Sequence, residues 1–180
     1  MRRTNENLDR ERRKQMLDAA LQCFLQFGYS KTSMDDVAKK ANLSRPLIYL
    51  KFKSKQDLFL GLYVDFTEEA LTQAATVLKS KRKRSTKEIL LEVTEIVTIR
   101  AWEKVAGHPM AAEFYPICQQ QFPKESERIE RDVVKIYQEI FEGDKGKAEV
   151  FLLAVDGLHT DTPTSKVLRK RLAILIDQFA

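Results

Sequence analysis

Helix-breaking residues are scarce in this chain, and this scarcity constrains the fold more than any other feature. The 180 residues include only 6 glycines and 5 prolines, which fall at intervals and leave long segments between them. Within those segments apolar side chains recur every three and four residues, as on one face of an α-helix. No sustained alternation of apolar and polar residues indicates a strand, and no Asn-Gly or Asp-Gly pair is flanked by such runs. We therefore expect an all-α fold of about nine helices.

Capping residues and breakers divide the chain into the expected helices. Ser33 and Asp36 form a capping box before the second helix, and Ser54 has the same role before the fourth. Gly28 is expected to close the first helix, whose apolar stripe extends to Phe27. The expected ranges are about 8–27, 34–41, 45–52, 55–80, 86–106, 110–122 (interrupted by Pro116), 123–143, 147–159 and 163–179, with a polar loop over Lys79–Arg84.

The net charge of +5 is concentrated at the start of the chain. Residues 1–60 hold 13 basic and 7 acidic side chains, a net charge of +6, whereas residues 61–180 hold 18 and 19. A basic module joined to a neutral body is typical of nucleic-acid binding, and a solvated charged surface is the alternative. We expect two domains, residues 1–54 and residues 55–180.

Several other classes of protein are disfavoured by the sequence. No apolar run reaches the ~18 residues of a membrane-spanning helix, and the charged N-terminus lacks the apolar segment of a signal peptide, so a cytoplasmic location is expected. His108 and His159 lie apart from each other and from both cysteines, so neither a metal site nor another cofactor is expected. No nucleophile–base pair or glycine-rich phosphate loop indicates an enzyme.

Two short helices joined by Asn42, Leu43 and Ser44 have the dimensions of a helix-turn-helix. Asn42 tolerates the left-handed conformation that this turn needs, and Ser44 is expected to cap the second helix. That helix has to bury one face, expected at Ile48 and Phe52, and to present the other face to a DNA groove. The alternative is a three-helix core with solvated charges, and the excess of positive charge favours DNA binding.

Residues 13–62 resemble the DNA-binding domain of the TetR/AcrR family of transcriptional regulators. The matching motifs are Phe27-Gly28-Tyr29, Ser33, Val37-Ala38, Ala41-Asn42-Leu43-Ser44, Ile48-Tyr49, Phe52, Lys55 and Leu58. Asn42 replaces the glycine that is usual in the family. Leu50 and Lys51 stand where the family often has aromatic or histidine residues, so the DNA sequence recognised cannot be transferred from relatives.

The resemblance implies a DNA-binding role for nine residues. Ser33, Tyr49 and Lys55 match positions that contact phosphate, and a lysine at a helix N-terminus suits that role. Leu47 and Leu50 match groove-facing positions, where they would contact thymine methyl groups; the alternative for Leu50 is a place in the core. The full set comprises Ser33, Ser44, Arg45, Pro46, Leu47, Tyr49, Leu50, Lys51 and Lys55.

The resemblance also implies that residues 55–180 bind a small molecule and dimerise. Leu168, Leu172, Leu175 and Phe179 form a seam that packs either across a two-fold axis or inside one subunit. The candidate pocket residues are Tyr63, Phe66, Trp102, Phe114, Tyr115, Cys118, Phe122 and Tyr137. No buried basic cluster is evident there, which favours an apolar or aromatic effector. A redox role for Cys118 is disfavoured because no resolving cysteine is near it in the sequence.

These features together predict a ligand-responsive regulator. It would be a homodimeric repressor that a small molecule releases from a palindromic operator in double-stranded DNA. The fourth helix is expected to connect the two sites, with residues 110–122 as the segment that moves. The alternatives are an architectural DNA-binding protein without an effector and an enzyme with an accessory DNA-binding head.

Overall fold

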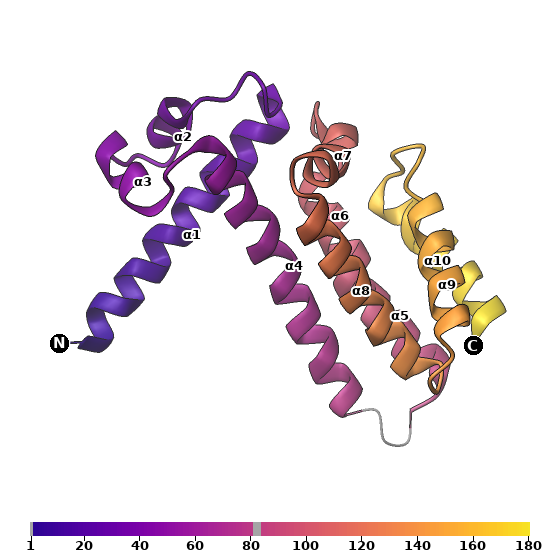
Figure 1. Ribbon diagram of the computed structural model, residues 1–180. Coiled ribbons are helices and arrows are strands. Elements are labelled where there is room, and N and C mark those ends of the chain that lie inside the picture. Colours follow the sequence, from indigo (N-terminus) through magenta and orange to yellow (C-terminus); the bar gives the residue numbers. More distant parts are fainter. Residues whose placement is uncertain (1, 81–83) are drawn as a thin grey trace. The chain divides into compact units, whose positions relative to one another are not determined.

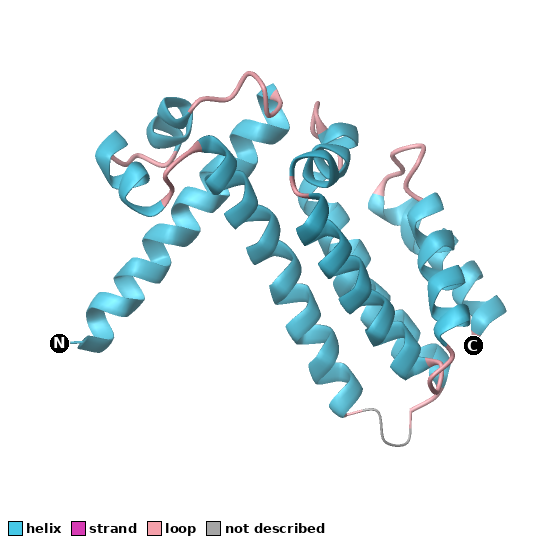
Figure 2. Cartoon of the chain, viewed as in Figure 1, coloured by secondary structure: helices cyan, strands magenta, loops and turns pink. Residues whose placement is uncertain are grey.

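The computed structural model describes residues 2–80 and 84–180, together with the side chains of these residues except 2–6. All regular structure in these ranges is helical, which confirms the predicted all-α fold (Figure 1, Figure 2). The elements are α1 (Arg2–Phe27), α2 (Met34–Lys40), α3 (Arg45–Lys51), α4 (Lys55–Lys79), α5 (Thr86–Thr94), the π-helical turn η1 (Glu95–Ile99), α6 (Arg100–Val105), α7 (Ala111–Gln121), α8 (Pro123–Ile140), α9 (Lys145–Gly157) and α10 (Ser165–Phe179).

The described part of the chain agrees with the expected number of helices. Because α5, η1 and α6 follow one another without a gap, they correspond to the single helix predicted over residues 86–106. Residues 81–83 of the predicted loop Lys79–Arg84 lie outside the described residues. Among the described residues, none of the helices combines the length and the apolar character needed to cross a bilayer.

The helices form two compact units. The N-terminal unit comprises residues 1–65 and 108–122, and the C-terminal unit comprises residues 66–107 and 123–180. Helix α4 contributes its first turns to one unit and its remaining turns to the other. The boundary predicted after residue 54 differs from the division between these packing units, and it stays a prediction.

Aromatic side chains from three helices form the core of the N-terminal unit. The ring centroid of Phe59 on α4 lies 4.9 Å from that of Phe24 on α1 and 5.6 Å from that of Phe114 on α7. These contacts explain why α7 belongs to this unit although it follows α4 by some thirty residues. The predicted interruption at Pro116 is wrong, because α7 runs through this proline. A proline removes one backbone donor but does not end a helix whose face is held by packing.

Two glycines shape the packing around α1 and α4. Gly28 closes α1 with φ +83°, as predicted for a C-cap. Phe27 was expected in the buried stripe of α1, but it is 53% exposed, since it occupies the last position of the helix, where the chain turns away. A Cβ atom on Gly61 would lie 2.8 Å from Cε1 of Phe52, so the missing side chain allows this buried ring to pack against α4.

The core of the C-terminal unit is built around Phe151 of α9. Its ring centroid lies 4.8 Å from that of Tyr137 on α8 and 5.1 Å from that of Phe179 on α10. Leu168 and Leu172 of α10 are buried within the chain itself. This half of the predicted seam therefore packs inside one subunit.

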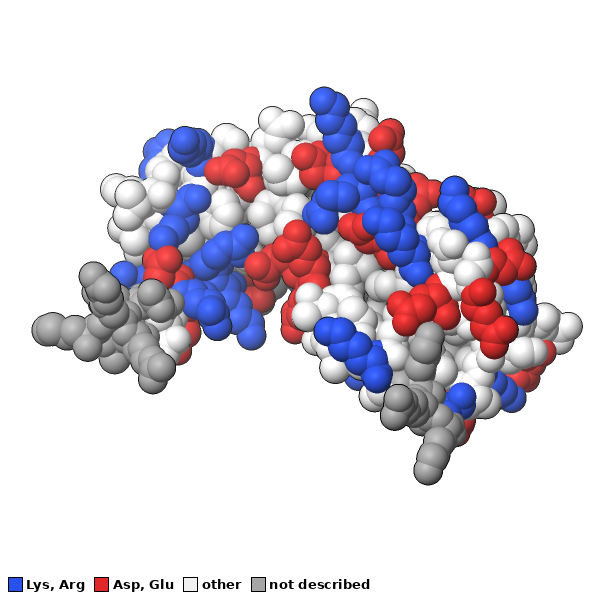
Figure 3. Space-filling model, turned by 60° about the horizontal axis from the view of Figure 1, so that its bottom comes forward, with Lys and Arg blue, Asp and Glu red and all other residues white. Residues whose placement is uncertain are grey.

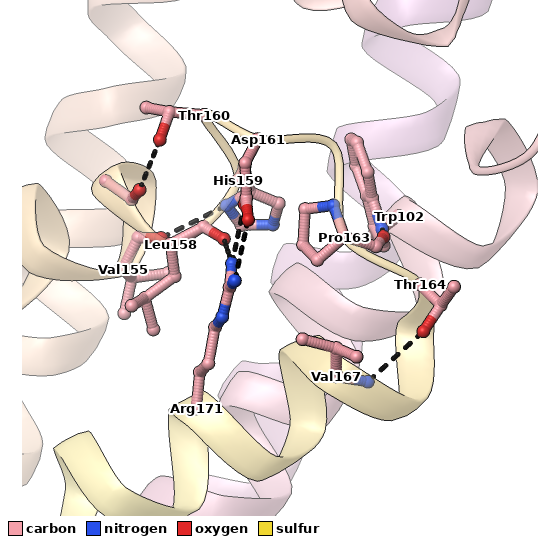
Figure 4. A network of polar contacts seen from close by, with 11 residues as sticks. Trp102, Val155, Leu158, His159, Thr160, Asp161, Pro163, Thr164, Val167 and Arg171 are labelled. Carbon is pink, nitrogen blue, oxygen red and sulfur yellow. Dashed lines mark hydrogen bonds and ion pairs between the residues drawn. The ribbon is translucent and has the colours of Figure 1, made fainter.

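Polar contacts fix the loop between α9 and α10 (Figure 4). The indole Nε1 of Trp102 donates a 2.7 Å hydrogen bond to the carbonyl oxygen of Pro163. The guanidinium of Arg171 binds both carboxylate oxygens of Asp161, each at 2.6 Å. The ring of His159 packs edge-on against Trp102, with 5.1 Å between the centroids. This loop is thus tied to both α6 and α10.

The partly buried position of His159 predicts a stability that depends on pH. Burial lowers the pKa of its imidazole below the ordinary 6.5. The unfolded chain then binds a proton more tightly than the folded chain, so the free energy of unfolding falls as the pH drops below about 6.5. We expect the Tm to decrease from about pH 7 to pH 5, and less steeply in His159→Gln. His108→Gln, which replaces the other histidine of the chain, is measured alongside for comparison. An unchanged slope in His159→Gln would contradict this assignment.

Candidate nucleic-acid interface

The N-terminus of α2 is closed by the predicted capping box. Ser33 Oγ accepts a hydrogen bond from the Asp36 N–H at 3.2 Å, and the Asp36 carboxylate accepts one from the Ser33 N–H at 2.9 Å. The Ser33 hydroxyl and the Ser33 N–H both donate to the Asp36 carboxylate, and these two bonds lower its pKa. The bond from the hydroxyl is 2.6 Å long, so a phosphate that binds Ser33 has to compete with Asp36.

The turn between α2 and α3 has the predicted left-handed residue. Asn42 has φ +51°, and the following Leu43 N–H donates to the carbonyl oxygen of Ala38 at 3.0 Å. This six-to-one hydrogen bond is the closing bond of a Schellman motif. Gln15 of α1 donates to the carbonyl oxygen of Ala41 at 2.6 Å and ties the turn to the first helix. The direction in which α3 leaves the turn is therefore fixed by the bond within the turn and by the bond from α1.

Ser44 stands at the N-cap of α3, but its side chain makes no capping hydrogen bond, so the predicted cap is wrong in this respect. A capping hydroxyl bonds the N–H of the second or third helical residue. The second residue here is Pro46, which has no N–H, and the third, Leu47, donates to the Ser44 carbonyl oxygen at 3.0 Å. The hydroxyl of the exposed Ser44 is left for another partner.

Helix α3 buries one face and exposes the other, as the sequence predicted. Ile48 and Phe52 are buried, whereas Leu50 is 76% exposed, which rules out the alternative that it belongs to the core. All nine residues predicted to bind DNA reach the surface: Ser33, Ser44, Arg45, Pro46, Tyr49 and Leu50 are exposed, and Leu47, Lys51 and Lys55 are partly buried. Their role in DNA binding stays a prediction.

Carboxylates that the sequence did not single out pair with two of the predicted DNA-binding cations. Arg45 Nε lies 2.9 Å from Oδ1 of Asp35, and Lys51 Nζ donates to Oδ2 of Asp9 at 2.7 Å. The partners are separated by 10 and 42 residues, so no helical periodicity indicates either pair. Figure 3 shows that basic and acidic side chains are interspersed on the face drawn there. The basic excess of the N-terminal region is therefore partly balanced within the chain.

The ammonium of Lys55 is bound by the loop that precedes α2 instead of being free, as expected for a phosphate site at a helix N-terminus. Its ammonium donates to the carbonyl oxygens of Tyr29 at 2.8 Å and Ser30 at 3.3 Å, and it lies 4.6 Å from the centroid of the Tyr29 ring. An ammonium has three N–H donors, so one remains beyond these two bonds. The contacts position Lys55 beside the loop that precedes α2.

The predicted ligand-pocket residues are divided between the two units. Tyr63, Phe114, Tyr115, Cys118 and Phe122 belong to the N-terminal unit, and Phe66, Trp102 and Tyr137 belong to the C-terminal unit. A small cleft in the N-terminal unit includes only Phe114 of this set and holds about 10 Å³, room for about one water molecule. The pocket assignment stays a prediction. Burial raises the pKa of the Cys118 thiol, which disfavours the reactive thiolate of a redox sensor.

The geometry defines a helix-turn-helix domain of two seven-residue helices, in which α2 packs on α1, α3 packs on α2, and α3 presents an exposed face. Residues 16–62 match the family model for bacterial regulatory proteins of the tetR family. Over these residues the chain is similar to regulators of the TetR/AcrR family.

Relatives with known sequences and structures extend this comparison. An uncharacterized HTH-type transcriptional regulator of Bacillus subtilis, YhgD, is 42% identical over 64 residues, 36% of this chain and 34% of that protein. A probable acrEF/envCD operon repressor of Escherichia coli is 40% identical over 52 residues, 29% of this chain and 24% of that protein. The match thus spans about a third or less of these relatives. The structure of a TetR-like transcriptional regulator from Rhodococcus is 26% identical with a TM-score of 0.65, covering 93% of this chain and 94% of that one.

The left-handed turn residue provides a test of the interface geometry. Asn42→Ala should lower the free energy of unfolding by about 1–2 kcal/mol, because alanine lacks the side chain that makes positive φ tolerable. Asn42→Gly should keep or raise the stability, since glycine adopts this conformation freely. Urea unfolding followed by circular dichroism compares the two variants with the wild type. Equal loss in both would show that the Asn42 side chain, rather than its backbone conformation, stabilises the turn.

Proposed function

We propose that the protein is a DNA-binding transcriptional regulator whose α3 enters the major groove. The observation that carries this proposal is the outward face of α3, where Arg45, Tyr49 and Leu50 are exposed while Ile48 anchors the opposite face. A guanidinium reads base edges or phosphate, and an exposed leucine fits the methyl group of thymine. Ser33 and Lys55, at the starts of α2 and α4, would contact the DNA backbone.

We propose further that the active form is a homodimer that binds a palindromic operator. Exposed apolar residues on α9 and α10 support this proposal, in particular Leu153 at 69% and Ile174 at 58% exposure, together with Val150 and Val167. These two helices pack against each other within the chain, so their outer faces offer a surface to a second copy. Two recognition helices about 34 Å apart would then meet successive turns of DNA.

The regulator is proposed to act as a repressor that an apolar or aromatic small molecule releases. The family resemblance supports this proposal, as does the operon-repressor name of one relative. An architectural protein without an effector would bind DNA with the same strength whatever molecule is added. An enzyme with an accessory DNA-binding head would turn over a substrate, and both relatives compared above are named as regulators or repressors instead.

Selection of duplexes from a random library tests the DNA-binding proposal, and the enriched sequence should be a palindrome. Lys55→Ala should then weaken binding to all duplexes alike and reduce the slope of log K against log salt by about one per half-site. Fluorescence anisotropy over a range of salt concentrations measures this slope. Lys166→Ala on α10 is the charge-matched control and should keep the wild-type slope. An unchanged slope in a folded Lys55→Ala protein would remove Lys55 from the interface.

The effector proposal predicts reciprocal coupling. A molecule that weakens operator binding by a given factor must bind the operator complex more weakly by the same factor, typically with a coupling of about 1–3 kcal/mol. Small molecules that copurify with the protein, identified by mass spectrometry, supply the candidates. Isothermal titration of each candidate with and without the selected duplex measures the coupling. Equal affinities with and without the duplex would show that the molecule does not regulate DNA binding.

A further inference from the structure

We propose that Asp35 is a specificity-determining residue of the DNA-binding surface, which holds Arg45 in position for a base edge and disfavours its contact with phosphate. This inference rests on the proposed function, because it assigns Asp35 a part in DNA recognition. Asp35 belongs to the first turn of α2, and Arg45 is the first residue of α3. The pair therefore joins the starts of the two helices of the helix-turn-helix.

The geometry fits a positioning role. Arg45 Nε lies 2.9 Å from Asp35 Oδ1, and Nη1 donates to Oδ2 at 3.3 Å. The guanidinium carbon also lies 5.5 Å from the centroid of the Tyr49 ring. Arginine side chains lose much rotamer freedom when they bind, and a guanidinium held by a carboxylate and a ring has lost part of that freedom beforehand.

The contact leaves part of the guanidinium fork for another partner. A guanidinium has five N–H donors; Nη1 donates to Asp35, Nε faces the same carboxylate, and the Tyr49 hydroxyl also bonds the guanidinium. Asp35 Oδ1 accepts none, although it lies close to Nε. With 62% of the Arg45 side chain and 47% of the Asp35 side chain exposed, an incoming DNA surface can reach both side chains, although Oδ1 of Asp35 is itself buried. A bidentate contact with a guanine edge needs only two of the remaining donors.

Charge explains why Asp35 would discriminate between the two kinds of DNA contact. A phosphate that approaches Arg45 also approaches the carboxylate of Asp35 and is repelled by it, whereas a base edge carries no net charge. The neighbouring Asp36 is bound to Ser33 in the capping box, so Asp35 is the acid of this turn that faces Arg45. A repulsive group of this kind raises specificity by weakening the wrong complex more than the right one.

The test compares the duplex selected from a random library with a scrambled duplex of the same length. Asp35→Asn should bind the scrambled duplex more tightly, with a salt slope steeper by about one per half-site, because Arg45 becomes free to bind phosphate. The ratio of selected to scrambled affinity should fall by about fivefold or more. Asp35→Ser, which also lacks the charge and keeps a side chain suited to a helix N-terminus, should give the same result if Asp35→Asn proves unstable.

Two controls separate the effect of the Asp35–Arg45 contact from the effect of the change in net charge. Asp18→Asn on α1 makes the same change in net charge at another exposed site and should leave the affinity ratio unchanged. In an Arg45→Ala background, Asp35→Asn should no longer alter the ratio, since a double-mutant cycle isolates the pair. An unaltered ratio in Asp35→Asn, or an equal fall with and without Arg45, would overturn the inference. A wild-type protein that selects no duplex would instead overturn the proposed function.

Discussion

The helix-turn-helix depends on burial of one face of two helices that are too short to be stable alone. Helices α2 and α3 have seven residues each, whereas isolated helices below about 12–15 residues are marginal in water. Val37 and Ile48 are almost completely buried and hold the two helices in the N-terminal unit. Because this burial fixes the rotation of each helix about its axis, it also fixes which side chains face outward. Burial of the inner face of α3 therefore determines which of its side chains are exposed.

Electrostatic pairing inside the protein limits what the exposed cations contribute. Arg45 and Lys51 face carboxylates, and Lys55 donates to backbone carbonyl oxygens. If these groups bind DNA, each would exchange one partner for another. The gain per phosphate would then be smaller than for a free cation, because an exposed ion pair is weak but still has to be broken. The count of basic residues therefore overstates non-specific affinity. On a surface that mixes acidic and basic side chains, charge alone attracts DNA weakly. Contacts that also fit in shape and form hydrogen bonds are then favoured.

Local sequence signals predicted the helix-turn-helix well, because its determinants lie within a few residues of one another. The capping box at Ser33 and the left-handed Asn42 follow from residue types at short spacing. The pairing of Asp9 with Lys51 depends on tertiary packing, which leaves no periodic trace. The π-helical turn η1 was missed for a similar reason: its residues Glu95–Ile99 keep an ordinary helical pattern of apolar side chains.

The chain passes between the two units at three places, after residues 65, 107 and 122. The first passage lies inside α4, which runs without a break from Lys55 to Lys79. The other two flank α7, beside Gly107 with φ +80° and beside Pro123, which has no N–H to continue the hydrogen bonding of α7. Because Phe114 of α7 and Phe59 of α4 pack on each other, both routes lead to one aromatic core. This core joins α1, α4 and α7 within the N-terminal unit, so a shift of α4 or of α7 has to be accommodated by the same rings.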